Sequence, residues 1–318
     1  MNTEGYRVLC LWDVTLFPSV LDQLKAVAQV DIHPPDRELV AAIIGNYDAI
    51  LVALSVPLDR ELIALATRMK TVVTPSTGLD HLDLAALSER GIAVQSIKVE
   101  YDLLDQVSAT AELAWALLLA ASRKLPAAHN AALEGRWARD EFRGTQIRGK
   151  TVGIVGVGRL GAMMARYAQA FGLQVLGCDP APRLTLDFVD YVDLDTLLAR
   201  ADIISLHVHL NESTRHLLDR AAFSRMKEGV TLINTSRGGL IDEAALVEAL
   251  ESGKVGAAGL DVIDGEWRTD LDQHPLIKLA QQHPGVVISP HIGGVTLESQ
   301  SITLKFSADR LARSLAAG

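Results

Sequence analysis

The stretch TVGIVGVGRLG, residues 151–161, decides the fold of this chain. A β-branched apolar run leads directly into Gly156, Gly158 and Gly161, and a helical pattern follows. In this context one glycine permits a tight turn, one lets the backbone approach a pyrophosphate, and one lets helix and strand pack closely. The stretch therefore predicts a strand, turn and helix that bind a dinucleotide.

Residues around this turn are expected to contact the same cofactor. Arg159 and Leu160 stand in the first turn of the helix, where free N–H groups and the helix dipole favour phosphate. The next predicted strand, LQVLGCD, ends in Asp179. Its carboxylate can bind the adenosine ribose and would repel a 2′-phosphate, which favours NAD over NADP. Arg183 could weaken this preference by pairing with such a phosphate. A purely structural role for Asp179, at the start of a turn, is the alternative.

Strand-like and helix-like patterns alternate on both sides of the glycine turn. Short β-rich runs alternate with helical stretches from residue 7 to about 94, and a second series begins at residue 151. This order predicts an α/β fold with two parallel-sheet domains, Rossmann-like or flavodoxin-like, and a cleft between them.

One apolar helix, roughly residues 103–122, and a polar segment are expected to connect the two series. The last helix, from about Thr296, is long and amphipathic, so we expect it to return to the first domain. We therefore assign residues 1–102 plus 292–318 to a substrate domain and residues 103–291 to an NAD-binding Rossmann domain.

Composition excludes several classes of protein. Of 318 residues, 49% are hydrophobic and 22% charged, which is typical of a folded globular protein. The net charge of −9 and the scattered Lys and Arg argue against nucleic acid as a partner. The longest apolar run, 113–121, is shorter than the roughly 20 residues of a membrane span, and the first residues lack a signal-peptide pattern. Cys10 and Cys178 are too few for a disulfide framework. We expect a cytoplasmic protein that binds no membrane.

A long, ordered set of motifs follows Asp179, namely MKEGVTLINTSRGGLIDEAALVEALESGKVGAAGLDV at 226–262, DGE at 264–266 and VVISPHIGG at 286–294. These motifs resemble the D-isomer-specific 2-hydroxyacid dehydrogenases, and the resemblance runs from about residue 71 to 294. It implies hydride transfer between NAD(H) and a small 2-oxo or 2-hydroxy acid of the D-series, such as glyoxylate, hydroxypyruvate or phosphoglycerate. Because the family is usually dimeric, it also implies a homodimer.

The resemblance assigns the chemistry to Arg237 in NTSRGG, Glu266 in DGE and His291 in SPHIGG. Reduction of a 2-oxo acid requires a proton at the carbonyl oxygen, and histidine titrates in the working pH range, so His291 is the expected acid/base. Glu266 is expected to stabilise the imidazolium and orient its ring. The planar guanidinium of Arg237 can bind the substrate carboxylate and polarise the keto oxygen.

Further site residues follow from the resemblance alone. The expected contacts to the nicotinamide end and the cofactor cleft are Thr110, His207, Thr235 and Asp261. The backbone at Thr77 and Gly78 is expected to receive the substrate carboxylate. Packing at strand ends and helix starts is the structural alternative for all six residues.

Departures from the family's pattern lie around the substrate and the cofactor. His209 and Trp267 both stand where proline is common, and TPSTGLD has one glycine where two are common. These changes bear on specificity more than on the type of reaction. His207 and His209 also have a spacing that two metal ligands on a strand can have, but no further ligand set accompanies them, so no metal is expected.

Other functions are compatible with the same motifs. A phosphite-type dehydrogenase shares the three residues, whereas formate-dehydrogenase-like enzymes resemble a pattern with glutamine in place of Glu266. An NAD(H)-responsive binding protein, like the corepressor relatives of the family, can also retain all three. Oxidation of NADH with a panel of 2-oxo acids would separate an enzyme from a sensor.

Overall fold

The structure is a computed structural model that describes residues 5–182 and 184–317, which form two compact units. Unit 1 ends at Val107 and takes up the chain again from Leu297, and unit 2 runs from Ser108 to Thr296. Both changes of unit lie five residues beyond those expected from the sequence, 102/103 and 291/292.

The prediction of a single helix over residues 103–122 is wrong, because the chain forms two helices there. α5 (Tyr101–Leu104) belongs to unit 1 and α6 (Ala109–Ser122) belongs to unit 2. Tight turns over residues 105–107 separate them, closed by backbone hydrogen bonds of 3.1 and 2.9 Å. Neither α6, with 14 residues, nor any other helix in the described part of the chain has the length and apolar character that crossing a membrane requires.

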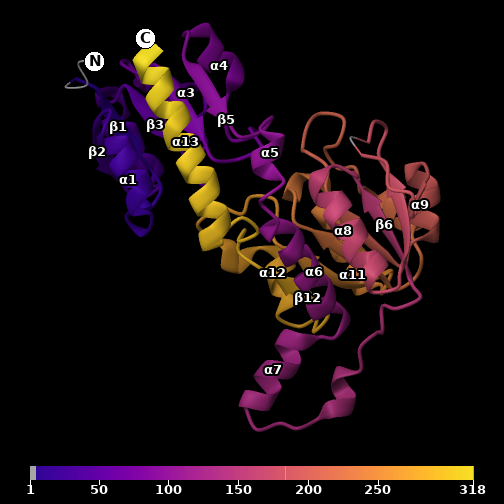
Figure 1. The fold of residues 1–318 in the computed structure, drawn as a ribbon. Helices are drawn as coiled ribbons and strands as arrows, with labels where there is room; N and C mark the ends of the chain where they lie inside the picture. The colour runs from indigo at the N-terminus through magenta and orange to yellow at the C-terminus, as the bar shows by residue number, and fades with distance from the viewer. Residues whose placement is uncertain (1–4, 183, 318) are drawn as a thin grey trace. The chain divides into compact units, whose positions relative to one another are not determined.

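Unit 1 is built on a five-stranded sheet in the order β2-β1-β3-β4-β5, with every neighbouring pair parallel. This is the order of flavodoxin-like sheets. α13 (Leu297–Ala317) returns to this unit and runs beside the sheet, in yellow in Figure 1. The strands are β1 (Arg7–Cys10), β2 (Gln29–Ile32), β3 (Ala49–Leu51), β4 (Thr71–Thr74) and β5 (Ala93–Ser96). The remaining helices are α1 (Pro18–Lys25), α2 (Arg37–Ile43), α3 (Arg60–Leu65) and α4 (Leu84–Glu89).

Both faces of this sheet are covered because strand side chains alternate between them. Leu9 joins a buried cluster with residues of α2, α3 and α4, while Val8 joins a second cluster with residues of α1 and α13. Leu304 and Leu311 of α13 lie in that second cluster and are at most 1% exposed. The last helix is therefore part of the core of unit 1.

Unit 2 contains a seven-stranded parallel sheet in the order β12-β11-β10-β9-β6-β7-β8. The strands are β6 (Thr151–Val155), β7 (Gln174–Cys178), β8 (Val189–Tyr191), β9 (Ile203–Leu206), β10 (Val230–Asn234), β11 (Val255–Leu260) and β12 (Val286–Ile288). Besides α6, the helices are α7 (Leu125–Leu133), α8 (Arg159–Ala170), α9 (Leu194–Arg200), α10 (Arg220–Arg225), α11 (Glu243–Glu251) and α12 (Pro275–Ala280). The strand order reverses between β6 and β9, which is where such sheets bind ligands.

Two hydrophobic clusters cover the two faces of this second sheet. Ile154 of β6 packs with residues of α6 and α8, whereas the next residue, Val155, packs with residues of α9 to α12. The same alternation holds in β9, where Ile203 and Ile204 face opposite clusters. Near-continuous apolar strands of this kind are typical of sheets buried on both faces.

Three elements of the structure were not expected. β2 and β8 are edge strands, and the residues of β2 are all partly or fully exposed, so neither strand forms a conspicuous apolar run. α7 takes up the start of the segment that was expected to be a polar connection. Of its residues, Ala131 is buried, which leaves most of this helix at the surface.

Candidate active site

The predicted site residues of unit 2 gather at one edge of its sheet. All seven strands are parallel, so their carboxyl ends point the same way. The residues that directly follow these ends, or lie a few positions beyond them, are Gly156, Asp179, His207, Thr235, Arg237, Asp261, Glu266 and His291. Thr110 lies in the first turn of α6.

The glycine turn between β6 and α8 has the geometry that its sequence predicts. Gly156 has a φ of +90°, and a Cβ at this position would lie 2.9 Å from His207 O. A Cβ on Gly161 would overlap Gly156 O, so only glycine lets α8 approach the turn. A Cβ on Gly158 would meet no atom within 4 Å, and this residue caps the N-terminus of α8. The N-terminus of α8, which begins at Arg159, therefore has space beside Gly158 for a phosphate group.

Asp179 is tied to this turn through its side chain. One carboxylate oxygen accepts a hydrogen bond from Val157 N–H at 2.9 Å, and the other accepts one from Ala181 N–H at 3.0 Å. A carboxylate has about four acceptor positions, so two backbone contacts leave capacity for the hydroxyl groups of a ribose. Arg183, which was considered as a partner for a 2′-phosphate, lies outside the described residues.

Two buried polar atoms at the same edge of the sheet suit a polar ligand. Thr235 Oγ1 and His207 Nδ1 are buried and have no hydrogen-bond partner within residues 5–182 and 184–317. The other ring nitrogen of His207, Nε2, lies 2.8 Å from Ser205 Oγ. A buried polar atom without a partner is costly, and a bound ligand can supply the missing hydrogen bond. Together with the glycine turn and Asp179, these atoms fit a dinucleotide.

The burial of His207 leads us to predict how the stability of the protein depends on pH. Burial lowers its pKa from 6.5 to about 4, so the folded protein holds a neutral ring. The unfolded chain binds a proton near pH 6.5, so stability falls as the pH drops from there towards 4. The ring nitrogen Nδ1 is buried, but the residue as a whole is partly exposed, which moderates the effect. We therefore expect the free energy of unfolding to fall by about 1–2 kcal/mol between pH 7 and pH 5. Urea unfolding at both pH values should show a smaller loss in His207→Asn, and an equal loss would contradict the prediction.

Glu266 and His291 form a short hydrogen bond. His291 Nδ1 lies 2.7 Å from Glu266 Oε1, and the two side chains are only 15% and 18% exposed, respectively. Glu266 lies on the loop that follows β11, and His291 lies just after β12, the strand next to β11. This contact fixes the plane of the ring and leaves Nε2 as the nitrogen that can exchange a proton with a ligand.

The backbone of His291 is in the left-handed region, with φ at +55°. Asp261 holds this conformation: its Oδ1 accepts hydrogen bonds from Ser289 Oγ at 2.6 Å and Ile292 N–H at 2.9 Å, and its Oδ2 accepts one from Gly293 N–H at 2.7 Å. Its main-chain oxygen accepts a hydrogen bond from His291 N–H at 2.9 Å. Burial raises the pKa of Asp261, while these hydrogen bonds act in the opposite direction. Strained backbone of this kind is typical of functional sites.

Thr110 packs against the same turn. A Cβ added to Gly293 would lie 3.1 Å from Thr110 Cγ2 and 3.0 Å from Asp261 Oδ2. The glycine therefore permits close contact between the start of α6 and the turn that carries His291. Thr110 and Asp261 thus both lie beside the turn that carries His291. The sequence predicts these residues for the site but not their contact with one another.

The loop that carries Arg237 lies directly against the loop that carries Glu266. Asn234, the last residue of β10, donates a hydrogen bond from Nδ2 to Arg237 O at 2.8 Å. Arg237 Nη1 in turn donates one to Ser236 O at 2.8 Å. A Cβ on Gly238 would overlap the backbone of residues 263–264, so this glycine lets the two loops meet.

Glu243 and His274 were not predicted, yet they anchor the loop that carries Glu266. Glu243 Oε1 accepts a hydrogen bond from Asp264 N–H at 2.7 Å, and His274 Nε2 lies 3.1 Å from Asp264 O. The two side chains also approach each other, with His274 Nε2 3.2 Å from Glu243 Oε2. Burial raises the pKa of Glu243. Glu243 lies within the motif at 226–262 and His274 lies outside the quoted motifs, but the sequence singles out neither residue, because the contact between them depends on the fold.

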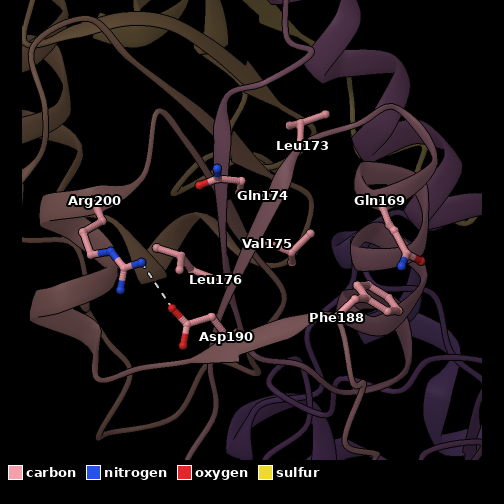
Figure 2. Close-up of a pocket in the computed structure, with 8 residues that line it drawn as sticks. All are labelled: Gln169, Leu173, Gln174, Val175, Leu176, Phe188, Asp190 and Arg200. Carbon is pink, nitrogen blue, oxygen red and sulfur yellow. Dashed lines mark ion pairs between the residues drawn. The ribbon is translucent and has the colours of Figure 1, made fainter.

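The remaining predicted positions lie elsewhere. Thr77 and Gly78 are in unit 1, on the partly exposed loop after β4. No group of three or more His, Cys, Asp or Glu side chains among the described residues is arranged to hold a metal ion. A pocket of about 310 Å³ lies at the amino ends of β7 and β8, on a different part of unit 2, and contains no predicted site residue. Figure 2 shows Arg200 and Asp190 pointing toward each other there, with a 3.2 Å ion pair.

Comparison with known proteins identifies the family. Residues 115–293 match the family described as D-isomer specific 2-hydroxyacid dehydrogenase, NAD binding domain. A hydroxypyruvate reductase of Thermotoga maritima is 39% identical over 276 residues, 87% of this chain and 87% of that protein. A D-3-phosphoglycerate dehydrogenase of Mycobacterium tuberculosis is 41% identical over 289 residues, 90% of this chain and 52% of that protein. The structure of a D-lactate dehydrogenase from Aquifex aeolicus with NAD and lactic acid superposes with a TM-score of 0.84 at 28% identity, covering 96% of this chain and 94% of that one.

The chain therefore belongs to the D-isomer specific 2-hydroxyacid dehydrogenase family. The family match covers an NAD-binding domain, and the structure of the TT0316 protein from Thermus thermophilus superposes over 98% of this chain and 97% of that one, with a TM-score of 0.85 at 33% identity. The predictions of the family, of the two parallel sheets and of NAD as cofactor are thereby confirmed. The chain spans about half the length of the mycobacterial phosphoglycerate dehydrogenases that it matches.

Proposed function

We propose that this protein is an NAD-dependent oxidoreductase that interconverts a small 2-oxo acid and the corresponding D-2-hydroxy acid. The observation that carries the proposal is the 2.7 Å contact between His291 and Glu266 at the same sheet edge as the glycine turn. An acid/base group beside a dinucleotide site is what carbonyl reduction needs. The relatives named above reduce or oxidise acids of this class according to their names, which supports the same chemistry here.

Each of the three side chains has a separate part in the proposed reaction. Bound NADH would supply the hydride to the carbonyl carbon. His291 would donate a proton from Nε2 to the carbonyl oxygen, and Glu266 would stabilise the imidazolium and hold its plane. Arg237 would bind the substrate carboxylate and polarise the carbonyl. In the reverse direction His291 would accept the hydroxyl proton.

The panel of glyoxylate, hydroxypyruvate, pyruvate and longer 2-oxo acids tests this function. We expect NADH oxidation with at least one of them and a D-configured product wherever the product is chiral. Tight NADH binding without turnover on any acid would instead favour the sensor alternative. Phosphite-dependent reduction of NAD would favour the phosphite-type alternative.

The position of Asp179 leads to a prediction about the choice between NADH and NADPH. We propose that its carboxylate binds the ribose and repels a 2′-phosphate. Asp179→Asn keeps an acceptor for Val157 N–H but removes the negative charge. The variant therefore tests the repulsion of a 2′-phosphate without disturbing the turn. We expect the ratio of kcat/KM for NADH over NADPH to fall by about tenfold or more. Steady-state kinetics with both cofactors measure it, and an unchanged ratio would locate the selectivity elsewhere.

Roles of the remaining predicted residues are also part of the proposal. Unit 2 would bind the dinucleotide through its glycine turn and through Thr110, His207, Thr235 and Asp261. Unit 1 would act as the substrate domain, with Thr77 and Gly78 receiving the substrate carboxylate. Both cysteines are free, which supports a reducing compartment such as the cytoplasm. The net charge of −9 supports the absence of nucleic acid among the partners.

We further propose that the protein is a homodimer that uses the surface around α7. Leu125, Leu133 and Trp137 are 59%, 74% and 85% exposed, respectively. Large apolar side chains gathered within a short segment favour contact with another protein surface, and a second copy is the commonest such partner. Sedimentation equilibrium should give a dimer for the wild type and a shift towards monomer for Trp137→Glu. A wild-type monomer would contradict the proposal.

A further inference from the structure

Trp267 stacks against the His291 ring. The ring centroids are 5.8 Å apart and the planes are inclined by 23°, so the two rings are stacked. Trp267 is 49% exposed, whereas the side chain of His291 is 15% exposed. The imidazole is therefore hydrogen-bonded at its edge by Glu266 and stacked against the indole of Trp267. This tryptophan stands where the family's pattern usually has proline, which offers no aromatic face.

An indole face distinguishes the two protonation states of the ring beneath it. The π-system presents negative charge on its face and attracts a cation that lies within about 6 Å of its centroid. A neutral imidazole gains only dispersion from the same contact. The indole of Trp267 thus favours the imidazolium over the neutral ring.

The charged groups around the stacked rings of His291 and Trp267 include two carboxylates and one guanidinium. Glu266, on the loop after β11, accepts its hydrogen bond, and Asp261, at the end of β11, adds an attractive charge. Arg268 follows Trp267 directly, but its guanidinium is engaged with Asp270, with Nη2 at 2.5 Å from Oδ2. The cation next to the indole therefore already has its own carboxylate partner.

We propose that Trp267 is a positioning residue that stacks against the ring of His291, fixes its orientation and favours its protonated form. The proposal rests on the proposed function, because the imidazolium is the proton donor for reduction of a 2-oxo acid. Trp267 would act together with Glu266, one residue from the face and the other from the edge. The departure from proline would then extend the pH range of reduction upwards.

The first test reads the protonation of His291 without turnover. Protein with ¹³C-labelled histidine is titrated by NMR, and the His291 signal is assigned by its absence in His291→Gln. We expect the midpoint to fall by about half a pH unit in Trp267→Leu and to stay near the wild-type value in Trp267→Phe. Phe171→Leu, which removes an aromatic ring of similar exposure, 47%, from the residue that follows α8, is the matched control. An unchanged midpoint in Trp267→Leu would overturn the proposal.

The second test follows the reaction itself. The pH above which oxo-acid reduction declines should fall by about half a unit in Trp267→Leu, with recovery in Trp267→Phe. Equal pH profiles in wild type and Trp267→Leu would overturn the role in the reaction. If the NMR shift is found but no 2-oxo acid is reduced, the contact between Trp267 and His291 stands and the proposed function fails.

Discussion

Replacing His291 by alanine is expected to lower the turnover of oxo-acid reduction by about 10²–10⁴-fold, the usual contribution of a positioned general acid. Among the predicted site residues, His291 is the one whose Nδ1 contacts Glu266, at 2.7 Å. Its other ring nitrogen, Nε2, can then exchange a proton with a ligand. NADH affinity should be preserved, because the glycine turn and Asp179 follow other strands, β6 and β7. Pre-steady-state measurement of the chemical step, with NADH binding followed by fluorescence, separates the two quantities.

The control for this variant is His33→Ala, which removes a partly exposed histidine that follows β2 in unit 1. It should leave the rate of reduction and the affinity for NADH as in the wild type. If His291→Ala reduces an oxo acid as fast as the wild type does, another group supplies the proton. A parallel loss of NADH affinity would instead show that the turn held by Asp261 had collapsed.

The sequence predicts the central strands of both sheets well because burial on two faces leaves an unmistakable apolar run. The two strands that escape prediction, β2 and β8, are both edge strands. β2 contains Gln29 and Asp31, and Asp31 is committed to an ion pair with Arg7 at 2.7 Å, which lowers the pKa of the carboxyl group. β8 has three residues and pairs only with β7. Their strand character comes from pairing with a neighbour, which a local pattern cannot reveal.

The candidate site divides in the same way. Arg237, Glu266 and His291 could be predicted because each lies within a recognisable motif at the carboxyl end of a strand. The contacts that hold them in place could not, because they join distant parts of the chain. Glu243 reaches Asp264 across 21 residues, and Asp261 reaches Gly293 across 32. Contacts of this length follow from the order of β10, β11 and β12 in the sheet.

A conservative substitution of Arg237 is also expected to have a large effect on the reduction of 2-oxo acids. Its main chain is held by Asn234, and one Nη1–H group donates to Ser236 O, so the side chain is anchored close to its own loop. A guanidinium has five N–H donors in a fixed plane, which suits a two-pronged contact with a carboxylate. Lysine keeps the charge but not this planar arrangement.

We therefore expect Arg237→Lys to lower kcat/KM for 2-oxo acids by about 10²–10³-fold, as the loss of a charge-stabilising donor typically does. The affinity for NADH should change little, and Arg166→Lys, at an exposed position on α8, should behave as the wild type. The comparison of a 2-oxo acid with its methyl ester sharpens the test, because the ester lacks the charged group that the guanidinium is expected to bind. Wild type should strongly prefer the acid, whereas Arg237→Lys should discriminate much less. Equal preference in both proteins would remove Arg237 from substrate binding, and the carboxylate would then have to be recognised by other groups, of which the backbone at Thr77 and Gly78 is the predicted one.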